Sequence, residues 1–178
     1  MGTDGRANRL NIFFLGGKQA GCIGLLTTLA VGCRITGVVA YDGLVRGLAE
    51  KMNLPTFQSI NEEGCVNLLY ASDLIVCVHG REIIPNNVLE IPLLGGINVH
   101  PCLYKYKGSN PIGRLLSDGN PKASVGVHHM MGELDSGGVI AELFVDVSNK
   151  NTIVEVYNEL YPIYSMVLLE ALVWLRDN

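Results

Sequence analysis

The sequence predicts an α/β domain built on a mostly parallel, twisted sheet with helices on both faces. Short apolar runs alternate with segments of helical length along most of the chain, and such alternation favours a parallel sheet. One run, "DLIVCVHG" (73–80), is apolar without alternation, as are parallel strands buried on both faces. The chain has 178 residues and shows no repeat or linker, so we expect a single domain.

The first half of the chain predicts two strand–helix units followed by a further helix. Residues 10–17 form a short apolar run that ends in paired glycines, as a buried strand does, and 20–32 has helical length. The run 34–42 predicts the second strand. In 43–53, apolar residues recur at spacings of four, which is the repeat of a helix face. A further helix is expected over 62–72.

The second half of the chain adds three strands and two helices to the strand at 73–80. We expect a strand over 95–100 and a helix over 110–119. The extended runs 123–131 and 138–147 have no helix between them, so they are expected to be antiparallel neighbours joined by a tight loop. The last segment, 152–178, predicts a long helix that is interrupted or kinked at its internal proline.

Composition and charge narrow the classes of protein to which the chain can belong. Apolar residues make up 48% of the sequence and charged residues 17%, so a substantial core is available. The net charge is −4 and lysine and arginine form no stripe, which disfavours nucleic acid as a partner. The first residues lack the order of a signal peptide. We expect 1–8 to be a disordered or artificially added tail.

Neither a membrane nor an oxidising compartment is indicated. The apolar stretch 161–175 contains a proline and a glutamate and is too short to span a bilayer comfortably. The five cysteines are odd in number and scattered, with no C-x-x-C pair. They argue against a disulfide framework and a thiolate zinc site. We therefore expect a cytoplasmic protein.

The last helix carries large apolar residues on every side, which predicts burial in its own domain or in a partner. These residues are Val156, Leu160, Ile163, Met166, Val167, Leu168, Val173 and Trp174. We favour burial within the domain, and a homodimer through this helix is the alternative.

The glycine-rich stretch "LGGKQAGCIG" (15–24) joins the first strand to the first helix. Backbone N–H groups at such a turn can bind an anion, and Lys18 would help Gly16 and Gly17 to do so. The spacing matches neither a dinucleotide-binding nor a Walker fingerprint. A tight turn with close helix packing is the equal alternative.

The stretch "GINVHPCLYKYKG" (96–108) places an amide and an imidazole at the end of a strand. Asn98 and His100 are two residues apart and share one face of that strand, and Pro101 turns the chain out of the sheet. Ligands of open α/β sheets bind at the carboxyl ends of strands, and an amide there can stabilise a developing oxyanion. We favour a functional site over a polar sheet edge.

Asp135 lies in the loop between the last two strands, followed by Ser-Gly-Gly. This loop can return the carboxylate to the strand ends, although a turn aspartate is the alternative. His128 and His129 point to opposite faces of their strand, so at most one of them shares the pocket. A zinc site made of His100, one of these histidines and Asp135 is a further alternative, which neither an H-E-x-x-H spacing nor a cysteine pair supports.

Residues 97–142 resemble the core signature of the formyltransferases that use 10-formyltetrahydrofolate. This family includes glycinamide ribonucleotide, methionyl-tRNA and nucleotide-sugar N-formyltransferases. Its pattern runs Asn-x-His-Pro-Ser-Leu-Leu-Pro, an aromatic and a glycine, a strand ending in Val-His, and Asp-x-Gly-x-Ile. Asn98, His100 and Asp135 match its polar residues, and His128 falls on the strand histidine. The resemblance implies a Rossmann-like formyltransferase fold and a formyltransferase catalytic domain over 9–178.

The chain departs from the family pattern in two places. Cys102 stands where serine is usual, and Tyr104 and Lys105 replace the second leucine and the proline. In the expected folate loop, "VHGREIIP" (78–85), Arg81 is followed by a glutamate. Neither departure removes a group of the expected site.

The resemblance assigns roles to individual residues. The expected catalytic residues are Asn98, His100 and Asp135. The expected cofactor-binding residues are Val78, Gly80, Arg81, Glu82, Ile83 and Asp135. The expected substrate-binding residues are Gly16, Gly17, Lys18, Tyr106 and Gly108. No metal is expected.

The implied reaction is attack of an unprotonated amine on the formyl group carried by N10 of the folate. Asn98 and a cationic His100 would stabilise the oxygen, and Asp135 would raise the pKa of His100 or take the proton of the amine. We expect a small-molecule acceptor, namely a nucleotide-linked amino sugar, with glycinamide ribonucleotide as the alternative. The non-enzymatic alternative is a folate-binding or degenerate interaction module.

Overall fold

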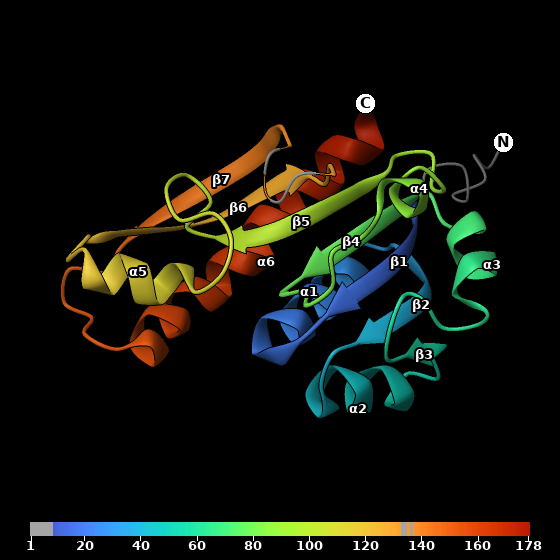
Figure 1. Ribbon diagram of the computed structural model, residues 1–178, viewed down its shortest axis with the longest axis horizontal. Coiled ribbons are helices and arrows are strands. Elements are labelled where there is room, and N and C mark those ends of the chain that lie inside the picture. The colour runs from blue at the N-terminus through green and yellow to red at the C-terminus, as the bar shows by residue number, and fades with distance from the viewer. Residues whose placement is uncertain (1–8, 133–134, 136) are drawn as a thin grey trace, which may run out of the picture.

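The computed structural model describes residues 9–132, 135 and 137–178. Within them the strands form one seven-stranded sheet in the order β3-β2-β1-β4-β5-β6-β7 (Figure 1). The strands are β1 (Asn11–Gly16), β2 (Arg34–Ala40), β3 (Thr56–Phe57), β4 (Leu74–Val78), β5 (Gly96–Pro101), β6 (Lys122–His129) and β7 (Val139–Asp146). Strands β1 to β5 pair in parallel, and β6 and β7 are antiparallel to their neighbours. The predicted α/β architecture is confirmed.

The helices are α1 (Lys18–Ala30), α2 (Gly43–Lys51), α3 (Cys65–Tyr70), α4 (Asn86–Leu89), α5 (Pro111–Ser117) and α6 (Ile153–Asp177). Every expected strand and helix is present, with shorter ends at most of them. The sequence prediction missed β3 and α4. Both have few residues, so hydrophobic periodicity does not reveal them.

Two apolar cores cover the two faces of the sheet, because successive side chains of a strand point to opposite faces. In β1, Ile12 and Phe14 join the core under α1, α2 and α6. Phe13 and Leu15 join the smaller core under α3 and α4. Figure 1 shows α6 running along the sheet next to α1, and α6 contacts both β6 and β7.

Helix α6 is continuous through Pro162, so the expected interruption is wrong, while the expected kink stays a prediction. The proline lies on the exposed side of the helix, where water can replace the hydrogen bond that it removes. Leu160 and Tyr164 on the opposite side are buried and hold the helix to the sheet. A capping box between Thr152 and Glu155 starts the helix.

Burial within the domain accounts for half of the apolar residues singled out in α6. Val156, Leu160, Val167 and Leu168 are buried, and Ile163 and Val173 are half-buried. Met166 and Trp174 remain 55% and 49% exposed. The homodimer stays a prediction. Among the residues described, no helix has the length and apolar character needed to cross a membrane.

Candidate active site

A cleft of about 450 Å³ lies at the carboxyl ends of β4 and β5. Strand β5 supplies Asn98 and His100, which share one face, while the side chain of Val99 between them is buried in the core. His100 is 9% exposed. Pro101 is the last residue of β5. The strand end therefore delivers an amide and an imidazole to the same cleft.

Asp135 closes this arrangement from the loop that leads to β7. Its carboxylate Oδ2 lies 3.3 Å from His100 Nε2 and accepts a hydrogen bond of 2.7 Å from the Gly108 N–H. Its Oδ1 lies 3.2 Å from His128 Nε2 and accepts from Asn98 Nδ2 at 3.3 Å. One buried carboxylate thus contacts four groups from three segments of the chain.

His128 is brought to the site by the register of β6, which places it opposite Asn98 on β5. Its Nδ1 donates to the carbonyl of His129 at 2.9 Å, so its Nε2 is the atom that faces Asp135 and Asn98. The side chain is 2% exposed. His129 does not line the cleft, as expected for the opposite face of the strand.

The charges in the cleft depend on a balance between burial and these contacts. Burial raises the pKa of Asp135, but the hydrogen bond with His128, the charge of His100 and the Gly108 N–H outweigh it and lower the pKa to about 2. Burial lowers the pKa of His100, and the opposing effects of Asp135 and Gly108 do not cancel it. The sequence analysis expected Asp135 to raise the pKa of His100, but burial outweighs that contact and lowers it.

One wall of the cleft is the segment that follows β4. Gly80, Arg81, Glu82 and Ile83, which the sequence analysis expected to bind the folate, line the cleft. Val78 does not line it. Val78 is buried against α1, so close that a Cβ on Gly24 would lie 2.7 Å from it.

The carboxylate of Glu82 anchors this wall to the neighbouring strand end. It accepts hydrogen bonds from Ser59 Oγ at 2.5 Å, from the Tyr41 hydroxyl at 3.0 Å and from the Ile60 N–H at 3.3 Å. Glu82, which departs from the family pattern, therefore fixes the position of this wall in this chain.

Gly16, Gly17 and Lys18 form the turn between β1 and α1, and none of them lines the cleft. The Lys18 N–H donates to Asp42, whose other carboxylate oxygen accepts from the N–H groups of Leu44 and Val45. Asp42 thus caps α2 and also occupies the first N–H of α1. A Cβ on Gly16 would lie 3.2 Å from Gly21, so the turn has the close helix packing of the alternative interpretation.

The segment between β5 and α5 contains Tyr106 and Gly108. Gly108 lines the cleft, whereas Tyr106 is buried and donates its hydroxyl proton to Asp118 Oδ2 at 2.9 Å. Tyr106 therefore faces α5. Its neighbour Tyr104 donates to the Lys122 carbonyl at 2.6 Å. Tyr104 and Lys105, which depart from the family pattern, thus fix this segment through hydrogen bonds to the Lys122 carbonyl and to Asp118.

The sequence analysis missed His79 as a residue of the cleft. It has a φ of 60°, and burial, aided by the charges of Lys18 and Arg81, lowers its pKa to about 4. Its place directly after a buried strand was the signal that could have revealed it. Tyr157 of α6 also lines the cleft, and only the fold brings it there.

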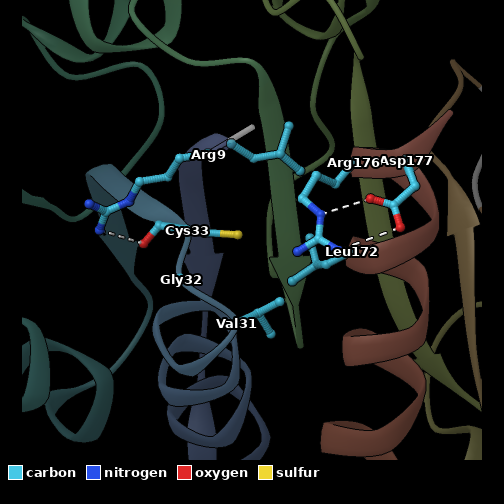
Figure 2. A pocket seen from close by; sticks show the side chains of 8 residues that line it. Arg9, Val31, Gly32, Cys33, Leu172, Arg176 and Asp177 are labelled. Atoms are coloured by element: carbon cyan, nitrogen blue, oxygen red, sulfur yellow. Dashed lines mark hydrogen bonds and ion pairs between the residues drawn. The ribbon is translucent and has the colours of Figure 1, made fainter. Parts of the chain in front are cut away.

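A second cavity, of about 540 Å³, lies beside the last turn of α6, and Figure 2 shows the side chains that line it. Its two arginines already have partners: Arg9 donates to the Cys33 carbonyl at 3.4 Å, and Arg176 pairs with Asp177 at 2.9 Å. In the described part of the chain, no three His, Cys, Asp or Glu side chains are grouped so as to hold a metal ion. The amide of Asn98, the imidazoles of His100 and His128 and the carboxylate of Asp135 all line the first cleft, which is therefore the candidate active site.

The chain is similar to known formyltransferases in sequence. It is 28% identical to methionyl-tRNA formyltransferase of Thermotoga maritima over 186 residues, which cover 95% of this chain and 59% of that protein. It is 30% identical to the enzyme of the same name from Staphylococcus aureus (strain N315) over 133 residues, 72% of this chain and 43% of that protein. The chain thus spans about half the length of these relatives.

Solved structures show the same fold. Phosphoribosylglycinamide formyltransferase from Anaplasma phagocytophilum superimposes with a TM-score of 0.81 at 21% identity, covering 95% of this chain and 88% of that one. A formyltetrahydrofolate deformylase from Pseudomonas syringae pv. tomato gives a TM-score of 0.77 at 19% identity, with 93% and 61% covered. The formyl transferase family model matches residues 49–172, a span that contains every polar group of the cleft. The chain belongs to the formyl transferase family.

Proposed function

We propose that this protein transfers a formyl group from 10-formyltetrahydrofolate to the primary amine of a small molecule. The observation that carries the proposal is the contact of Asp135 with both Asn98 and His100 in one cleft. Membership of the formyl transferase family supports it. We assign catalysis to these three residues and a supporting role to His128.

The cleft suits the folate. Its volume of about 450 Å³ lies within the range of small-molecule sites. Its wall combines backbone groups at Gly80 with apolar side chains at Ile83, Ile84 and Met130, a mixture that can hold a flat polar ring system. The bound folate supplies the activated formyl group.

The residues of the chain divide the chemistry among them. Asn98 Nδ2 donates a hydrogen bond to the formyl oxygen as negative charge develops on it. The imidazole of His100 lines the cleft beside Asp135, and in its neutral form it can accept the proton of the attacking amine. Asp135 then stabilises the resulting imidazolium through Nε2, 3.3 Å away. This role requires His100 to be neutral before the amine attacks, and the lowering of its pKa by burial favours that form.

We further propose a nucleotide-linked amino sugar as the acceptor. Asp42 supports this choice over glycinamide ribonucleotide, because its carboxylate holds the Lys18 N–H at the turn where a terminal phosphate would bind. An acceptor that presents a sugar ring to the cleft does not need this turn to be open.

The test is a panel of amines incubated with 10-formyltetrahydrofolate while the release of tetrahydrofolate is followed. The panel contains sugar-nucleotide amines, phosphoribosyl amines and amines without phosphate. Turnover with sugar-nucleotide amines supports the whole proposal. Turnover with a phosphoribosyl amine alone supports the enzyme and overturns the acceptor. Binding of the folate without turnover on any amine indicates a folate-binding module.

A cytoplasmic location and a homodimer are also proposals. The five cysteines are free, as in a reducing compartment. Met166, Leu169 and Trp174 expose apolar surface along α6. Sedimentation across a concentration range tests the dimer, and a constant monomer mass contradicts it.

A further inference from the structure

One backbone peptide, between Lys107 and Gly108, is central to the cleft. Its N–H donates to Asp135 Oδ2 at 2.7 Å. The carbonyl of Gly108 accepts from His100 Nε2 at 3.0 Å. The position of Gly108 therefore influences both titratable groups at once.

The other end of the same peptide is held by Arg114. Arg114 Nη2 donates to the Lys107 carbonyl at 2.5 Å and to the Tyr106 carbonyl at 2.8 Å. The Lys107 carbonyl and the Gly108 N–H belong to one rigid, planar, trans unit. A guanidinium thus lies on one side of this peptide and the carboxylate of Asp135 on the other. A positive donor on the carbonyl also polarises the N–H, which strengthens its bond to the carboxylate.

Arg114 is itself well supported. It belongs to α5, whose Ile112 and Leu115 are buried in the core. Its guanidinium lies 5.8 Å from the ring centre of Tyr106, and the hydroxyl of that tyrosine is fixed by Asp118. Residues 102–108 belong to no helix or strand. Hydrogen bonds from side chains such as that of Arg114 therefore determine the position of Gly108.

We propose that Arg114 is a positioning residue: by holding the Lys107–Gly108 peptide, it keeps Asp135 and His100 in their mutual arrangement. Its effect on catalysis rests on the proposed function. Its effect on the peptide does not, and the two are measured separately.

The first measurement is hydrogen exchange of the Gly108 amide in the free protein, followed by NMR. The variants are Arg114→Met and Arg114→Lys. The control is Lys105→Met, because Lys105 pairs with Asp118 at 3.2 Å and lies over the Tyr106 ring but is not bonded to the Lys107 carbonyl. We expect exchange about tenfold faster in Arg114→Met, an intermediate rate in Arg114→Lys, and the wild-type rate in the control.

The second measurement is steady-state formyl transfer by the same variants. We expect kcat to fall about 10- to 100-fold in Arg114→Met with KM nearly unchanged, and Arg114→Lys to recover part of the loss. Arg114 is exposed, so the variants are expected to fold.

Two results overturn the inference: an unchanged Gly108 exchange rate in Arg114→Met, or faster exchange with wild-type kcat. If the wild type turns over no amine, the proposed function fails. The exchange rate of Gly108 then decides alone whether Arg114 positions this peptide.

Discussion

The carboxylate of Asp135 and the imidazole of His100 lie 3.3 Å apart, although His100 belongs to β5 and Asp135 lies between β6 and β7. Asp135 depends on its contacts to stay ionised, because burial alone would raise its pKa. Burial disfavours charge on both, and it leaves His100 with a lowered pKa while the contacts of Asp135 keep the carboxylate ionised. The pair therefore places an ionised carboxylate beside an imidazole whose pKa burial lowers.

The ionisation of Asp135 predicts an acid-sensitive part of the stability. Its pKa of about 2 in the folded protein lies below the ordinary 3.8, so it stabilises the fold above pH 4 and this contribution is lost as the pH falls through 2. Between pH 4 and pH 2, we expect the wild type to lose more of its free energy of unfolding than Asp135→Asn does. The difference between the two losses should be on the order of 1–2 kcal/mol. Urea titrations across this range measure it, and parallel slopes would contradict it.

Removal of the Asn98 amide is expected to slow the chemical step. Asn98→Ala should lower kcat by about 10²- to 10³-fold, because one donor to a developing oxyanion contributes about 2.7–4 kcal/mol. The control is Asn120→Ala, whose amide bonds the hydroxyls of Tyr104 and Tyr106 outside the cleft. Equal kcat values for the two variants would contradict the role of Asn98.

Asp42 is expected to exclude phosphate from the turn between β1 and α1. Asp42→Asn keeps a side chain that can cap α2 but removes the negative charge at the Lys18 N–H. Inorganic phosphate should then inhibit the variant more strongly than the wild type. Asp42→Ala serves as the control for capping, with a loss of about 0.5–2 kcal/mol of stability. Identical phosphate inhibition of wild type and Asp42→Asn would refute the charge argument.

Glu82 is expected to act on folate affinity through the wall of the cleft. Glu82→Ala loses the bonds to Ser59, Tyr41 and Ile60 that anchor this wall. We expect KM for 10-formyltetrahydrofolate to rise about tenfold, with a smaller change in kcat. Glu82→Gln keeps acceptors for part of this network and should lie between. If only the KM for the amine rose, the proposed effect of Glu82 on folate affinity would be contradicted.

Tyr106 and Tyr164 are both buried, but only the hydroxyl of Tyr106 has a hydrogen-bond partner among the described residues. Tyr164 is 1% exposed, and its hydroxyl has no hydrogen-bond partner within the described residues. Tyr164→Phe is therefore expected to leave the stability unchanged or raise it. Tyr106→Phe removes a bond to Asp118 and should cost about 1 kcal/mol. Chemical denaturation compares them, and a loss confined to Tyr164→Phe would contradict the assignment.

The order of strands and helices could be predicted from apolar periodicity, and so could the pairing of Asn98 with His100 on one face of β5. The approach of Asp135 was predicted from the Ser-Gly-Gly that follows it in the sequence, and periodicity alone could not place it. The contact of His128 with Asn98 depends on the antiparallel register of β5 and β6. Register is set by long-range pairing, so a single sequence does not reveal it.

Other features required the three-dimensional structure. Tyr106 resembled a residue of the substrate site, yet a bond to Asp118 turns it towards α5. Asp135 was expected to raise the pKa of His100, whereas burial of the ring has the larger effect and lowers it. The cap that Asp42 provides to two helices joins residues 24 positions apart, and no local pattern predicts it.

The most direct test of the central claim is the rate of amine-dependent tetrahydrofolate release by wild type and Asp135→Asn at neutral pH. Both proteins are first shown to be folded by thermal unfolding. We predict turnover by the wild type and a rate about 10²- to 10⁴-fold lower for Asp135→Asn. Equal rates for the two folded proteins would contradict the assignment of catalysis to this cleft.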